Sequence, residues 1–125
     1  ELKAIDYVYK NNQNNRFSVY VWIPSIFDHN YQYLFRWYGK NKYEQMPCEI
    51  NTYPKSPQTY LPNWYAPESR PDYKCQPVYR YLIMEPDKNN SIDQSWYSDI
   101  TKNTTLIEKS NSGKILLEKR LINKK

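Results

Sequence analysis

The only adjacent pair suited to general acid or base chemistry near neutral pH is Asp28–His29, which contains the single histidine of the chain. A neighbouring carboxylate can orient an imidazole as a base. The alternative is a solvated pair in a loop that follows Pro24, and this is the interpretation that we prefer. We interpret two further carboxylate pairs in the same way: Asp93 with Asp99, and Glu85 with Asp87.

No catalytic motif accompanies these residues. The chain contains neither GxSxG nor HExxH, and its two glycines are too few for a glycine-rich phosphate loop. A zinc site needs about four ligands, and His29 is far in sequence from both cysteines. The sequence therefore predicts a protein that is not an enzyme and that has no cofactor and no bound metal.

The two cysteines, Cys48 and Cys75, are too far apart for a CxxC redox motif. They can be buried thiols or one structural disulfide. The segment between them is rich in proline and poor in aliphatic residues, so packing alone would hold it weakly. A disulfide closing a loop of about 28 residues stabilises a fold by roughly 3–4 kcal/mol. We therefore predict a Cys48–Cys75 disulfide and, with it, an extracytoplasmic location, either secreted or periplasmic.

Residues 47–77 contain seven prolines, a density that prevents both helix and central strand. The segment is too aromatic for a disordered linker, and we interpret it as an ordered, irregular excursion. Surface loops on a rigid scaffold often carry binding residues. The predicted partner-binding residues are of types enriched in binding hot spots: Tyr60, Trp64, Tyr65 and Arg70. The alternative is that these rings only cover one end of the fold.

A second set of aromatic residues has period-2 spacing: Tyr31, Tyr33, Phe35 and Trp37. On a strand they would share one face. Such a stripe can be part of a core, a stacking platform for sugars or bases, or a protein interface. We interpret it as core, with Trp37 buried.

Alternating or continuous apolar residues predict strands at 4–9, 16–23, 31–38 and 78–84, with 16–23 central and covered on both faces. Residues 91–103 suggest a loop with a short helical turn. A hairpin is predicted from 104–109 and 114–122, although the second segment also contains strong helix formers. The fold class is therefore mostly β: one domain over 1–125, a small antiparallel sandwich or barrel of five to six strands with a long Pro-rich, disulfide-tied loop.

Composition is consistent with a folded domain of this kind. Leu, Ile, Val and Phe make up only 25 of 125 residues, but 14 Tyr and 4 Trp add large apolar surfaces to the core. No apolar run approaches the ~20 residues of a membrane span. The net charge of +5 comes entirely from residues 101–125, which hold 7 basic and 2 acidic side chains. This basic C-terminal segment is either a solvated terminus that aids solubility or a docking tail.

These observations predict a non-catalytic binding domain that recognises another protein, of the inhibitor or immunity type. One alternative is a carbohydrate-binding module with Tyr and Trp platforms. Another is a single-stranded nucleic-acid binder, which is less expected because the aromatic body is neutral and nucleic-acid binders spread basic residues over their binding face. Two sequons occur, at Asn89 and Asn103, and matter only for a secreted glycoprotein.

Overall fold

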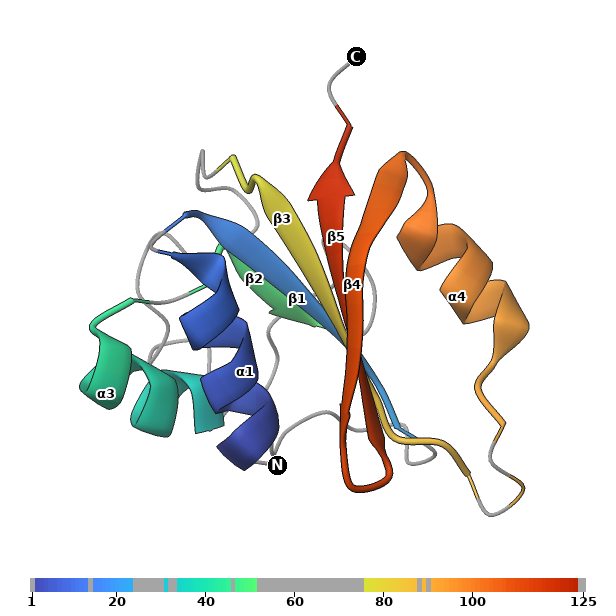
Figure 1. Cartoon of the computed structure of the whole chain (residues 1–125), viewed down its shortest axis with the longest axis horizontal. Helices are drawn as coiled ribbons and strands as arrows, with labels where there is room; N and C mark the ends of the chain where they lie inside the picture. The colour runs from blue at the N-terminus through green and yellow to red at the C-terminus, as the bar shows by residue number, and fades with distance from the viewer. Residues whose placement is uncertain are drawn as a thin grey trace.

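The computed structural model describes residues 2–13, 15–23, 31, 34–45, 47–51, 76–87, 89 and 91–123. Their central feature is one five-stranded sheet with the order β2-β1-β3-β5-β4 (Figure 1). The strands are β1 (Phe17–Trp22), β2 (Glu49–Asn51), β3 (Tyr79–Met84), β4 (Thr104–Ser112) and β5 (Ile115–Ile122). The fold is mostly β, as predicted.

The sheet is mixed and open, which corrects two parts of the prediction. β1 runs parallel to both β2 and β3, whereas β3–β5 and β5–β4 are antiparallel. Among the described strands, β2 and β4 are the two edges and do not pair with each other, so the sheet is neither a barrel nor a sandwich. The prediction failed because side-chain alternation is the same in parallel and antiparallel strands and contains no information on their direction.

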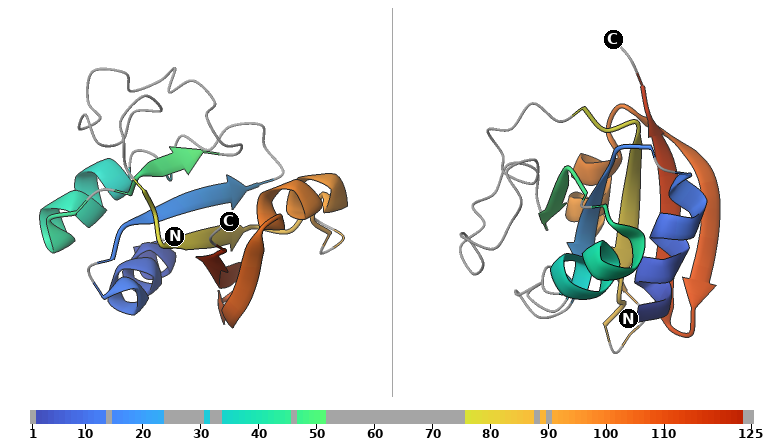
Figure 2. Two further views of the ribbon diagram at one scale, coloured as in Figure 1. Left: turned by 90° about the horizontal axis from the view of Figure 1, so that it is seen from above. Right: turned by 90° about the vertical axis from the view of Figure 1, so that its left-hand side faces the viewer.

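The central strands are buried on both faces, as predicted for 16–23. Phe17, Val19 and Val21 point into one core, while Tyr20 lies in a second core on the opposite face. Helices cover both faces, with α1 and the η1–α3 pair on one side and α4 on the other (Figures 1 and 2). A strand with a helix layer on each face needs apolar residues at successive positions.

Residues 4–9 form part of helix α1 (Leu2–Asn12), so the strand predicted there is wrong. Its buried positions follow helical spacing, with Ile5, Val8, Tyr9 and Asn12 turned toward the sheet. Within the six residues 4–9, large apolar side chains also occur at every second position (Ile5, Tyr7 and Tyr9), which is the spacing of a strand. Gln13 ends the helix in the left-handed conformation, with φ 54°.

The strand predicted over 31–38 is also wrong. Its described part belongs to the π-helical turn η1 (Phe35–Gly39), which continues into α3 (Lys40–Tyr43). Tyr31 and Phe35 are fully buried, but Trp37 is 52% exposed, because a helical path turns it away from them. Gly39 lets this layer approach α1, since a Cβ there would lie 2.6 Å from the Tyr9 ring.

The second core lies under α4 (Gln94–Thr101), which confirms and extends the helical turn expected within 91–103. The Asp93 carboxylate caps its N-terminus by accepting from the backbone N–H groups of Ser95 (2.9 Å) and Trp96 (3.1 Å). Trp96 and Ile100, one turn apart, are buried against the sheet. Burial of these two side chains attaches the helix to its face.

β4 and β5 form the predicted hairpin, closed by the two-residue turn Gly113–Lys114 with Gly113 at φ 61°. A positive φ at the first turn residue only is the pattern of a type II′ turn, which favours glycine at that position. Most of the basic C-terminal segment therefore belongs to the sheet, with β4 largely exposed. β5 lies inside the sheet, and its Leu117 is 2% exposed within the main core.

Cys48 is buried at the entry to β2, where its backbone N–H donates to the Phe17 carbonyl at 2.7 Å. Its expected partner Cys75 lies outside the described residues, as does most of the Pro-rich segment. The disulfide and the tied loop therefore stay predictions.

Candidate binding surfaces on the C-terminal hairpin

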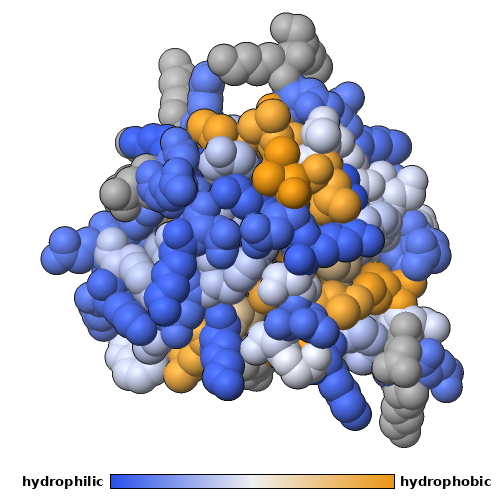
Figure 3. Space-filling model, viewed as in Figure 1, coloured by the Kyte–Doolittle hydropathy of each residue, from blue (hydrophilic) through white to orange (hydrophobic). Residues whose placement is uncertain are grey.

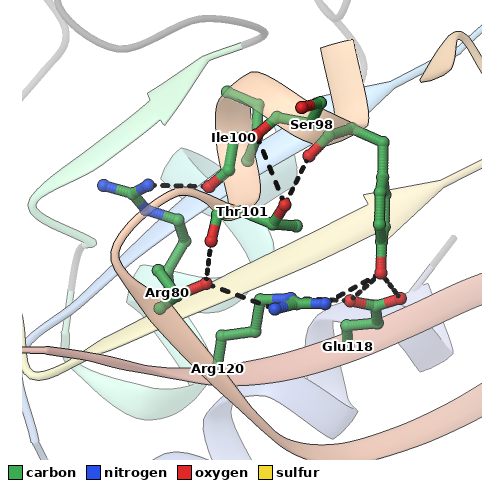
Figure 4. Close-up of polar contacts among 8 residues, drawn as sticks. Arg80, Ser98, Ile100, Thr101, Glu118 and Arg120 are labelled. Carbon is green, nitrogen blue, oxygen red and sulfur yellow. Dashed lines mark hydrogen bonds and ion pairs between the residues drawn. The ribbon is translucent and has the colours of Figure 1, made fainter. Parts of the chain in front are cut away.

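A buried ion pair joins β5 to the underside of α4. The Arg120 Nε donates to Glu118 at 2.8 Å, and these side chains are only 10% and 6% exposed. The Tyr97 hydroxyl, from α4, donates to both Glu118 oxygens at 3.0 and 2.8 Å. Burial and the Glu118 carboxylate raise the pKa of Tyr97, while Arg120 opposes the rise. Figure 4 shows these groups meeting between the helix and the strand.

Arg120 also contacts the start of β4, since its guanidinium reaches the Thr104 hydroxyl at 3.3 Å. Thr104 in turn donates to the Thr101 carbonyl at the end of α4 (2.6 Å). Arg80 of β3 donates to the nearby Ile100 carbonyl at 2.8 Å (Figure 4). The C-terminal carbonyls of α4 thus face donors and cations, the arrangement that the helix dipole favours.

A cavity of about 600 Å³ lies between the N-terminal half of α4 and the turn end of the hairpin. Its volume is within the range of small-molecule sites. The apolar part of its lining includes Met84, Ile92 and Leu116. Around them are polar residues from both strands and the helix: Gln94, Tyr97, Lys109, Ser110, Asn111 and Glu118.

The other end of the hairpin carries exposed apolar residues. Leu106, Ile107 and Leu121 are 39%, 52% and 37% exposed. Figure 3 shows hydrophobic surface gathered over this end of β4 and β5. A bulge between Leu106 and Glu108 interrupts the alternation of β4 there, so consecutive residues can both be exposed.

A further polar cluster lies on the opposite face of the sheet, where α1 meets α3. The Asp6 carboxylate accepts from the hydroxyls of Tyr43 (2.5 Å) and Tyr38 (3.0 Å) and from the Lys42 ammonium (3.2 Å). Burial alone would raise the pKa of Asp6, but these bonds and the Lys42 charge outweigh it and lower the pKa. The Tyr9 and Tyr43 rings stack at 4.5 Å. The cluster fastens α3 onto α1 and thereby has a clear structural role.

The predicted binding residues Tyr60, Trp64, Tyr65 and Arg70 lie outside the described residues, and so do Asp28, His29 and Tyr33. The described carboxylates of the two candidate pairs have structural partners. Asp93 caps α4, Asp99 pairs with Lys102 at 3.4 Å, Glu85 accepts from Tyr31, and Asp87 accepts from backbone N–H groups of a turn. Both sequon asparagines, Asn89 and Asn103, are exposed.

Sequence reasoning missed the surfaces formed by the hairpin. The available signal was the adjacent pair Leu106–Ile107, which breaks the alternation expected of a strand with one solvent face. Among the described residues, no group of three or more histidine, cysteine or acidic side chains is placed to hold a metal ion. No described helix has the length and apolar character needed to cross a bilayer.

Comparisons of this chain with protein-family models, with curated proteins and with solved structures find no match.

Proposed function

We propose that this chain is a non-catalytic binding domain that recognises another protein by adding an extended segment of that partner to the edge strand β4. The observation that carries the proposal is the combination of a nine-residue edge strand with exposed apolar side chains. In the part of the chain that the structure describes, β4 pairs only with β5. Alternate residues of such a strand turn their N–H and C=O groups outward, where another strand can pair with them.

The charges near this edge favour an acidic partner. Lys109 and Lys114 are exposed and form no ion pair among the described residues, whereas Glu108 accepts a hydrogen bond from Tyr7 at 2.6 Å. Acidic side chains on an incoming strand would pair with these lysines. A second copy of β4 would instead bring its own lysines to the interface, and like charges on neighbouring strands are destabilising. The proposed occupant is therefore an extended, acidic segment of a different protein.

The test uses two capped ten-residue peptides, one alternating valine with glutamate and the other valine with lysine. We expect the acidic peptide to bind with a Kd on the order of 100 μM and to slow hydrogen exchange of β4 amides. Ile107→Asp should weaken this binding at least tenfold. Val78→Asp is the matched control, because Val78 is also an exposed apolar residue, at 41%, but lies next to β3.

Three results would overturn the proposal. The first is protection from exchange elsewhere than on β4, and the second is equal binding of the two peptides. The third is equal weakening by Ile107→Asp and Val78→Asp. Trp64→Ala separates the edge from the predicted loop site, since it should leave peptide binding at β4 unchanged. Loss of binding in Trp64→Ala alone would place the partner site in the Pro-rich segment.

A carbohydrate-binding function is the second candidate, and the exposure of Trp37 favours it. A half-exposed indole on a short helical layer offers a flat surface on which a sugar ring can stack. Trp37→Ala should then abolish retention on a polysaccharide matrix without loss of fold. For the binding domain we also propose a location outside the cytoplasm, which depends on the predicted Cys48–Cys75 disulfide.

A further inference from the structure

We infer that the cavity between α4 and the turn end of the hairpin binds a small amphipathic anion, such as a medium-chain carboxylate. The apolar residues of this site lie at the turn end of the hairpin and those of the proposed partner surface at the other end, although both sites use Lys109. Its volume of about 600 Å³ is sufficient for a ligand of this kind.

Among the described residues of the lining, one positive group is available to a ligand. Glu118 faces the cavity, but both of its oxygens are engaged by Tyr97, and one also accepts from Arg120. Lys109 lies directly opposite Glu118 on the neighbouring strand, but the Glu118 carboxylate pairs with Arg120, and Lys109 forms no ion pair with any described residue. The ammonium of Lys109 is thus the uncompensated charge among the lining residues that the structure describes, and it selects an anion.

The remaining lining determines the rest of the ligand. The amides of Gln94 and Asn111 are further hydrogen-bond donors for an anionic head group. Met84, Ile92 and Leu116 provide the apolar surface that an alkyl chain would cover. A head group without a chain would lack most of the contact area, and a chain with a cationic head would face Lys109. The ligand therefore needs both an anionic head group and an apolar chain.

The experiment measures binding of decanoate by isothermal titration below its micelle concentration, with acetate and decylammonium as matched probes. We expect decanoate to bind with a Kd below about 1 mM and the other two to bind at least tenfold more weakly. Lys109→Met, which keeps the aliphatic stem, should weaken decanoate binding about fivefold. Lys102→Met is the control for a lost surface charge, because Lys102 pairs with Asp99 and does not line the cavity.

A second pair of variants tests the location. Leu116→Trp places a larger side chain in the lining and should weaken decanoate binding, whereas Leu121→Trp should not, although Leu121 is equally exposed on the same strand (37% against 36%). Equal effects of the two tryptophans, or equal binding of decanoate and decylammonium, would overturn the inference. Acetate binding as tightly as decanoate would show an adventitious ion only. Because Ile107 is not part of the lining, Ile107→Asp should leave decanoate binding unchanged, so that this site and the proposed peptide site can fail independently.

Discussion

Removing the positive partner of the buried ion pair should destabilise the fold far more than removing a surface charge. In Arg120→Met, the Glu118 carboxylate stays 6% exposed and loses its cation, and the bonds from Arg120 to Tyr97 and Thr104 disappear. Loss of one partner of a buried pair typically costs 3–5 kcal/mol. Tyr97 still donates to the carboxylate in this variant. We therefore expect a loss of about 3 kcal/mol in the free energy of unfolding, at the lower end of that range.

The matched surface variant is Lys102→Met. Lys102 and Asp99 lie 3.4 Å apart, but their side chains are 69% and 56% exposed. Solvent screens such a pair, and its removal should cost less than about 1 kcal/mol. Urea denaturation at pH 7, followed by far-UV circular dichroism, measures both changes on a single-domain chain of this size.

A double variant distinguishes a lost ion pair from lost packing. Replacing both charges, as in Glu118→Leu with Arg120→Met, leaves no unpaired buried charge, and such replacements are often neutral. The double variant should thus be at least about 1 kcal/mol more stable than Arg120→Met alone. If Arg120→Met costs no more than Lys102→Met, or if the double variant is as unstable as the single one, the ion pair does not have the role that its burial indicates.

Three further predictions concern other parts of the fold. Trp96→Ala should cost about 3–5 kcal/mol, because Trp96 is 1% exposed, whereas Trp37→Ala should cost less than about 1 kcal/mol; thermal melts measure both. The pKa of Asp6 is lowered in the folded state, so ionised Asp6 stabilises the fold above about pH 4, and this stabilisation is lost as the pH falls through the folded-state pKa. Asp6→Asn should therefore flatten the acid limb of a pH–stability curve. An unchanged acid limb would contradict this. Non-reducing mass spectrometry should find the native chain two hydrogens lighter than the reduced chain if Cys48 and Cys75 are joined, and two alkylatable thiols would disprove both the disulfide and the extracytoplasmic location.

The sequence predicted well those strands in which apolar and aromatic residues predominate with few polar interruptions. β1 and β3 are of this kind, because helices cover both faces of the sheet and apolar residues are needed at successive positions. The C-terminal hairpin was also predicted, since glycine in the turn favoured strands over the helix formers of 114–122. In all three cases the local pattern and the tertiary environment require the same conformation.

The two segments wrongly predicted as strands are short, and the spacing of their apolar residues fits both a strand and a helix. In 4–9, Ile5 and Tyr9 fit a strand with period 2, yet they are also four residues apart and share a helical face. In 31–38, Tyr31 and Phe35 are again four residues apart, and both are buried, while Trp37 is exposed. Only the packing of α1 and η1 on one face of the sheet decides between the two periods, and this packing involves residues distant in sequence.

Strand order explains why the proposed partner surface could not be identified from the residues alone. Leu106 and Ile107 would be core residues if β4 lay inside the sheet. They are exposed because β1 and β3 occupy the centre and β5 takes the remaining side of β3, which leaves β4 outermost. In the part of the chain that the structure describes, the opposite edge strand β2 comprises Glu49–Asn51, too short for a long ladder with a partner, whereas β4 has nine residues. Strand addition at β4 should therefore protect β4 amides from exchange and leave β2 amides unchanged, and protection at β2 instead would show that length does not determine which edge the partner uses.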